Sequence, residues 1–133
     1  GPWKQAAELI QRHIERTREL QTPDGSLSTN YFVGPGVTTD ASDLIRTTGH
    51  ALEFLTLSMT DEQLREPWVR RAVLNLCDVF EKTRDMQVEC GALYHAASGL
   101  RIYRARLYGD REYHHPEYVR ASSTPQPQAA AGQ

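Results

Sequence analysis

The chain has 133 residues, of which 39% are hydrophobic and 24% are charged, and its net charge is −2. These values fit one globular domain that can bury a core. Basic and acidic residues are mixed along the chain, which excludes the clustered basic face of a nucleic-acid-binding protein, and no apolar run approaches the roughly 20 residues of a membrane span.

Amphipathic helices are predicted wherever apolar residues recur every three or four positions. The first covers residues 3–20, carries an apolar stripe that begins at Trp3, and ends at the breaker sequence Thr22-Pro23-Asp24-Gly25. Residues 28–42 are typical of a loop. The second helix runs from about Asp43 to Met59 and is apolar on several faces, which predicts that it is buried.

Two local signals mark the start of the next helical segments. Thr60 and Gln63 form a capping-box pattern for a short turn, and Pro67 suits the first position of a third helix. A fourth helix is expected after Gly91. Residues 111–133 are predicted to be a largely flexible tail, because the stretch from residue 121 is rich in Ser, Pro, Gln and Ala. Residues 1–2, Gly-Pro, are typical of the scar of a cleaved fusion tag.

An internal repeat organises these helices. Residues 14–27 (IERTRELQTPDGSL) align with residues 80–93 (FEKTRDMQVECGAL) without a gap at an offset of 66. A second match, at an offset of 45, aligns His50-Ala51 with His95-Ala96. The repeat predicts an all-α domain over residues 3–110, made of two helical hairpins, 3–60 and 61–110. Residues 4–21 and 68–87 are the expected outer helices, and residues 44–59 and 92–108 the inner ones.

Four residues recur at the turn that follows each outer helix, and we expect them to be structural: Gln21, Gly25, Gln87 and Gly91. The glycines suit a backbone with positive φ or a close backbone approach. The glutamine amides are expected to hydrogen-bond backbone groups that the helix ends leave without partners.

These turns, Gln21-Thr-Pro-Asp-Gly25-Ser-Leu27 and Gln87-Val-Glu-Cys-Gly91-Ala-Leu93, resemble the Gln-x-x-x-Gly-x-Trp repeat of terpenoid cyclases and protein prenyltransferases, with Leu in place of Trp. The resemblance implies an α/α toroid, in which inner helices surround a central cavity. Residues 49–54, GHALEF, are also similar to inner helices of sugar epimerases. A full toroid needs more than two hairpins, so we expect this chain to be part of a larger polypeptide or to self-associate.

Three titratable residues are the candidate catalytic group: His50 and Glu53, one helical turn apart, and His95 at the matching repeat position. In a toroid they lie at the mouth of the cavity and are suited to acid–base work. Two other interpretations stay open. The histidines can pack at the helix starts, with Glu53 in an internal ion pair, or the three can bind a divalent metal with Asp40 or Asp43. The predicted site of His50, Glu53 and His95 includes no metal and no cofactor.

Two functions from different classes follow from these features. In the first, the chain is a segment of an α/α toroid that contributes His50, Glu53 and His95 to a cavity for an isoprenoid or carbohydrate-type molecule. In the second, it is a non-catalytic helical-repeat module for protein–protein interaction or oligomerisation. Whether the chain is an enzyme stays open, because the sequence contains no nucleophile elbow, phosphate loop or Cys/His nucleophile pattern.

Overall fold

The computed structural model describes residues 1–28 and 40–109, and within these ranges it is all-helical, as predicted. The helices are α1 (Pro2–Glu19), α2 (Ala41–Ser58), α3 (Asp61–Leu64), α4 (Pro67–Lys82) and α5 (Cys90–Tyr108). Most of the predicted loop 28–42 and all of the predicted tail 111–133 lie outside the described residues. None of the described helices is long and apolar enough to cross a membrane.

Capping groups in the sequence set several helix starts. Asp40 caps α2 by accepting hydrogen bonds from the backbone of Ser42 and Asp43. The predicted capping box of Thr60 and Gln63 is present at α3, and Pro67 opens α4, as predicted. These side chains satisfy or remove backbone donors that the first turn of a helix leaves unpaired.

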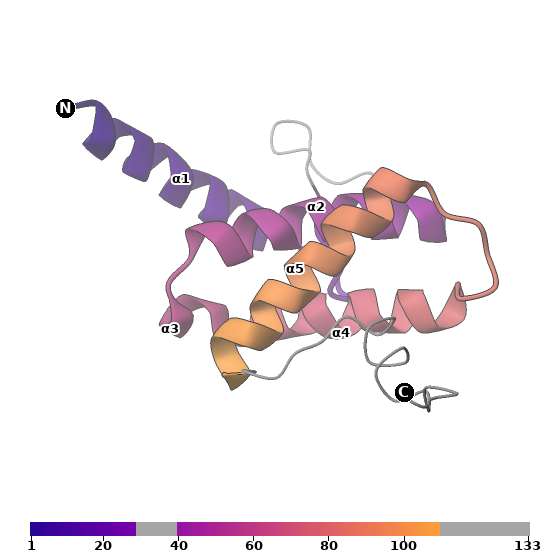
Figure 1. Cartoon of the computed structure of the whole chain (residues 1–133). Helices are drawn as coiled ribbons and strands as arrows, with labels where there is room; N and C mark the ends of the chain where they lie inside the picture. Colours follow the sequence, from indigo (N-terminus) through magenta and orange to yellow (C-terminus); the bar gives the residue numbers. More distant parts are fainter. Residues whose placement is uncertain (29–39, 110–133) are drawn as a thin grey trace, which may run out of the picture.

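Helices α2 and α5 form the centre of the molecule and make its most extensive helix–helix contact (Figure 1). Helix α4 packs against α2, and the short α3 contacts α5. The guanidinium of Arg106, on α5, stabilises the contact with α3 by donating to Asp61. It also donates to the carbonyl of Thr56 over 2.7 Å. The central position of α2 accounts for the burial of Ile45, Leu52 and Leu55, whereas Leu57 is 69% exposed.

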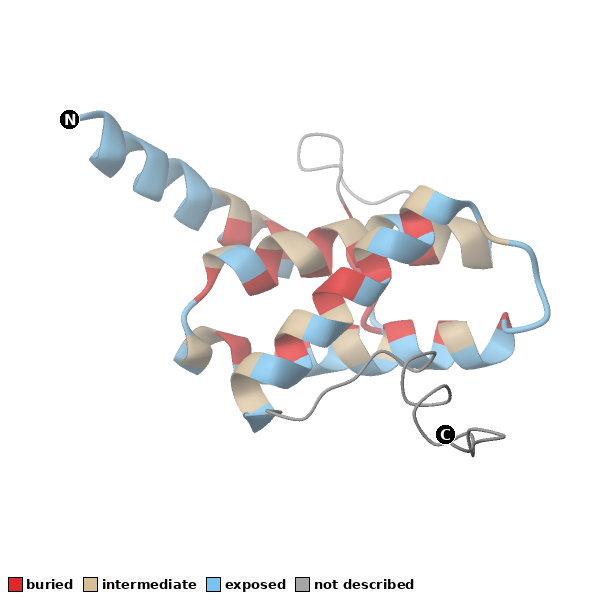
Figure 2. Cartoon of the chain, viewed as in Figure 1, coloured by how far each residue is buried: buried red, intermediate tan, exposed pale blue. Residues whose placement is uncertain are grey.

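The buried residues of the core cluster lie along the central parts of the helices, shown in red in Figure 2. The least exposed large side chains of the cluster are Ile45, Leu52, Leu55, Leu64, Val69 and Leu76. Met86 and Cys77 fall within the predicted outer helix 68–87 but lie outside the core: Met86 is 53% exposed and Cys77 is exposed as well. Helix α4 ends at Lys82, five residues before the predicted end, and the hydroxyl of Thr83 bonds back to the carbonyl of Val79 over 2.8 Å. Met86 therefore lies beyond the helix and off its stripe.

Helix α1 matches α4 in sequence but not in its surroundings. Only its last turns pack on the rest of the chain, where Ile14 and Thr17 are buried, and the remainder projects away (Figure 1). Residues 1–10 are all exposed. The helix predicted over residues 4–21 is present, but the apolar face of its first half is exposed, because no described helix covers it.

Candidate functional site

The three candidate catalytic residues lie together where α2 and α5 contact each other. Nδ1 of His95, on α5, is 2.6 Å from Oε1 of Glu53, on α2. A carboxylate oxygen only accepts, so Nδ1 of His95 carries the hydrogen. The side chains are 36% and 19% exposed, respectively, so the pair is accessible from solvent through the imidazole.

His50 completes the group by stacking on His95, with the ring centroids 4.1 Å apart and the planes inclined by 34°. Nδ1 of His50 is 2.7 Å from the carbonyl oxygen of Arg46, one turn earlier on α2. Because that carbonyl is an acceptor, Nδ1 of His50 is also a donor. In the neutral form of both rings, the basic nitrogen is then Nε2.

Small residues at the helix crossing bring the three side chains together. A Cβ added to Gly49 lies 2.7 Å from Cβ of Ala96, and one added to Gly99 lies 2.9 Å from the backbone nitrogen of Glu53. Neither position has room for a larger residue. Helices α2 and α5 therefore approach closely at Ala96 and Gly99, which follow His95 on α5, and residues from separate repeats share one site.

The electrostatics of the site favour an ionised Glu53. Partial burial acts to raise its pKa, but hydrogen bonds with Ser98 and His95 and the charges of the two histidines hold the pKa below its usual value. Glu89 caps α5, and hydrogen bonds from the backbone of Gly91 and Ala92 lower its pKa too. A carboxylate that orients an imidazole through Nδ1 is an arrangement suited to general acid–base chemistry at Nε2.

The two aspartates considered as metal ligands have other roles. Asp40 caps α2, and Asp43 forms an ion pair with Arg46. Within residues 1–28 and 40–109, no group of three or more His, Cys, Asp or Glu side chains is arranged to hold a metal ion. Tyr94 meets His95 edge to face, with the ring centroids 5.4 Å apart.

The turn residues of the two repeats differ in structure. The amide of Gln21 donates to the carbonyls of Gly25 and Trp68 over 3.0 and 2.8 Å, which ties the first turn to the start of α4. Gly25 has φ of +97°, and a Cβ there lies 2.6 Å from the carbonyl oxygen of Arg71. Gln87 is exposed, and its amide makes no hydrogen bond with any residue that the structure describes. Gly91 lies in the first turn of α5 instead of at a positive φ.

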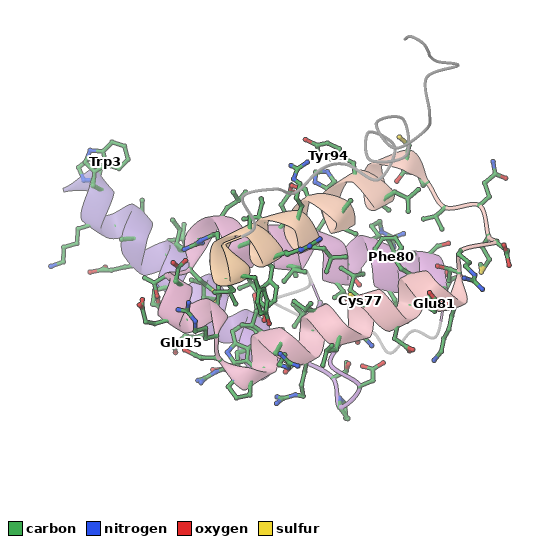
Figure 3. The ribbon with its side chains drawn as sticks, turned by 60° about the horizontal axis from the view of Figure 1, so that its bottom comes forward. Trp3, Glu15, Cys77, Phe80, Glu81 and Tyr94 are labelled. Carbon is green, nitrogen blue, oxygen red and sulfur yellow. The ribbon has the colours of Figure 1, made fainter. Side chains whose placement is uncertain are left out.

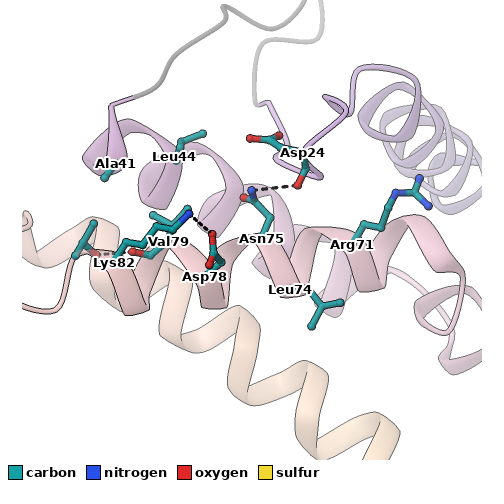
Figure 4. A pocket seen from close by; sticks show the side chains of 10 residues that line it. Asp24, Ala41, Leu44, Arg71, Leu74, Asn75, Asp78, Val79 and Lys82 are labelled. Atoms are coloured by element: carbon teal, nitrogen blue, oxygen red, sulfur yellow. Dashed lines mark hydrogen bonds and ion pairs between the residues drawn. The ribbon is translucent and has the colours of Figure 1, made fainter.

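A groove of about 570 Å³ lies between α4, the start of α2 and the turn after α1 (Figure 4). Asn75 donates from Nδ2 to the carbonyl of Asp24 over 3.2 Å, while its buried Oδ1 accepts no hydrogen bond from the described residues. Asp78 and Lys82 form an ion pair at the groove, 2.8 Å apart. Its lining does not include His50, Glu53 or His95. The sequence did not predict this groove, because the pattern around Asp24 indicates only a turn.

The second feature that sequence reasoning missed is the exposed apolar face of α1. Trp3 stands at the outer end of the helix (Figure 3) and is 88% exposed, while Ile10 is 40% exposed. The stripe was visible in the sequence, but its periodicity does not tell whether a partner helix covers it.

Comparison with known proteins adds no relative: no protein-family model, curated protein or solved structure matches the chain. Its function is therefore inferred from geometry and sequence.

Proposed function

We propose that this chain is a helical-repeat assembly module, which binds an apolar helical surface through the exposed face of α1. One observation carries the proposal: the stripe that buries Ile14 and Thr17 against the body continues outward, without a break in helical spacing, into Ala7, Ile10 and Trp3. An exposed apolar face of this kind favours association. Tryptophan is also among the residues that contribute most to binding at protein interfaces.

The form of α1 supports this function. Arg16 and Arg18 in the last turn of α1 complement the negative end of its dipole, so the helix carries its own C-terminal signal. Because its first half projects from the body, it can enter a groove or pack on a helix without displacing the core (Figure 1). Amphipathic helices recognise grooves through side chains three, four and seven positions apart, as in Trp3, Ala6, Ala7 and Ile10.

A photoreactive residue placed in α1 tests the proposal in cells that produce the chain. At position 10, on the exposed stripe, it is expected to give discrete crosslinked species. At position 12, which is exposed but off the stripe, it is expected to give few. Equal labelling at both positions, or no discrete product at position 10, would show that the face does not bind a helix.

We also propose a second function, which rests on the hydrogen bond between His95 and Glu53. When the chain is assembled with a further helical hairpin, His50 and His95 present Nε2 to a small molecule of the isoprenoid or carbohydrate class, with Glu53 orienting His95. The hydrogen bonds at both Nδ1 atoms support this function, because they hold the two rings in place. It needs a cavity around these side chains, and they are not among the residues that line the groove beside α4.

Histidine ring signals in NMR spectra test this second function. A soluble isoprenoid diphosphate and a disaccharide are added separately to the protein at a concentration that keeps it assembled. The signals of His50 and His95 are expected to shift with one of the two probes, while the signal of His13 on α1 serves as the internal control. If neither probe moves the two signals, the pair has no role in binding these molecules.

A further inference from the structure

The two repeats present the same helix face in two different situations. At the offset of 66, Trp3, Ala6 and Ile10 of α1 align with Val69, Ala72 and Leu76 of α4. The three α4 residues are 0% exposed, because α4 packs against α2, the inner helix of the preceding repeat. Their counterparts on α1 are exposed. The face of α1 therefore has the shape of one that packs on an inner helix, but the described residues supply no such helix.

The C-terminal parts of α1 and α4 have similar surroundings, which supports the equivalence of the two helices. Thr17 and Thr83 are 0% and 4% exposed, and each donates its hydroxyl to the carbonyl four residues earlier. The exposed face of α1 is thus continuous with a surface that is already packed inside the chain. At Trp3 and Ile10, in the first three turns, α1 is exposed where the aligned residues of α4 are buried.

At the other end of the described chain, Gln87 and α5 lack an outer helix to pack against. In the first repeat, Gln21 reaches the carbonyl of Trp68 in the first turn of the next outer helix, and its Oε1 accepts from Arg71. In the second repeat, Gln87 is exposed and bonds none of the described residues. The last inner helix, α5, also leaves Leu93 37% and Tyr94 65% exposed. This edge, formed by Gln87 and α5, has the residue types that bind an outer helix in the first repeat. The described residues contain no outer helix after α5.

We infer that a second copy of this chain supplies the missing helix, head to tail. Helix α1 of the second copy packs on α5 of the first as α4 packs on α2. The position equivalent to Trp68 is residue 2, so the amide of Gln87 donates to the main-chain carbonyl at that position of the second copy, whichever residue stands there. The inference rests on the proposed assembly function and names the partner. Since the two contacting surfaces differ, the contact is heterologous and forms rings or open chains.

Sedimentation velocity at increasing concentration tests the inference on the intact chain. The parent is expected to form dimers and larger species as its concentration rises. Ile10→Lys places a charge in the contact and is expected to weaken association roughly a hundredfold. Glu8→Lys introduces the same side chain off the stripe and is expected to associate like the parent. Since positions 8 and 10 are exposed, both variants should keep the parent's circular dichroism spectrum and melting curve.

Gln87→Glu probes the other edge. A carboxylate cannot donate to a carbonyl, so this nearly isosteric change is expected to weaken association roughly tenfold. The two variants are then mixed at a concentration at which each is monomeric. Each keeps the edge that the other has lost, so the mixture is expected to form a one-to-one complex that grows no further.

Three outcomes overturn the inference. One is a parent that stays monomeric at all concentrations, and a second is association that either edge variant leaves unchanged. The third is an absence of complex in the mixture, which would show that the two variants do not damage opposite edges of one contact. If the chain is monomeric but crosslinks from position 10 to a different polypeptide, the assembly function holds and the head-to-tail contact does not.

Discussion

Glu53 and His95, 42 positions apart in the chain, share a hydrogen bond of 2.6 Å that joins the inner helices of the two repeats. Both residues were chosen from the sequence as acid–base candidates. The bond gives them a further role, since it contributes to the contact between α2 and α5. Any change at this pair should therefore be visible in stability as well as in binding.

We expect Glu53→Gln to flatten the acid limb of the stability profile. The folded-state pKa of Glu53 is lowered, so the unfolded chain binds more protons in the acid range. The contribution of Glu53 is complete above the unfolded-state pKa of about 4.3 and is lost as pH falls through the lower folded-state value. Urea unfolding of parent and variant between neutral pH and about pH 3 measures the difference. Curves that run parallel across this range would contradict the prediction.

The two turn glutamines should differ in their effect on stability. Gln21 bonds the carbonyls of Gly25 and Trp68, so Gln21→Ala is expected to destabilise the fold by about 1–3 kcal/mol. Gln87→Ala is the matched control, because the aligned residue is exposed and bonds no described residue. At low concentration it is expected to melt within about 0.5 kcal/mol of the parent. Thermal denaturation compares them, and equal losses would mean that both turns are fastened in the same way.

Two leucines on α4 test the packing of this helix on α2. Leu76 is 0% exposed, so Leu76→Ala is expected to cost about 2–5 kcal/mol through lost burial and a residual cavity. Leu74, two positions earlier, is 54% exposed, and Leu74→Ala is expected to cost less than about 1 kcal/mol. Chemical denaturation of the two variants measures the difference. Similar losses would show that the face of α4 is assigned wrongly.

Local signals in the sequence predicted helix type and several helix starts. Apolar spacing, the Thr60–Gln63 capping box and Pro67 each act within a few residues, so one sequence is enough to recognise them. The repeat grouped His50, Glu53 and His95, because His95 occupies the position that matches His50, but it did not predict the bond between Glu53 and His95. The ring stacking and the direction of each Nδ1 depend on how closely α2 and α5 approach, which spacing alone does not determine.

The packing partner of an apolar helix face could not be predicted from such local signals. Trp3 and Val69 occupy equivalent positions, yet one is 88% exposed and the other 0%. Periodicity reports that a face is apolar, whereas burial depends on a partner that is distant in sequence or absent from it. The same reason applies to Gln87, whose sequence context matches that of Gln21 while its surroundings do not.

Gly49 is where the closest approach of α2 to α5 can be tested. A Cβ at this position lies 2.7 Å from Cβ and 2.8 Å from Cα of Ala96, so the helices must move apart to admit it. Gly49→Ala is therefore expected to destabilise the fold by about 1–3 kcal/mol, even though alanine favours a helix more than glycine. Separation of the helices should also weaken the bond of His95 to Glu53, which the ring signal of His95 reports.

A second change separates this clash from other effects. Ala96→Gly removes the Cβ that meets the new methyl group. The double variant is therefore expected to lose less unfolding free energy than the sum of the losses of the two single variants. The gain should be partial, because the Cα of residue 96 remains in close contact. Denaturant unfolding of the four proteins gives the coupling energy. Strict additivity, or a Gly49→Ala variant more stable than the parent, would show that the helices do not cross closely at this point.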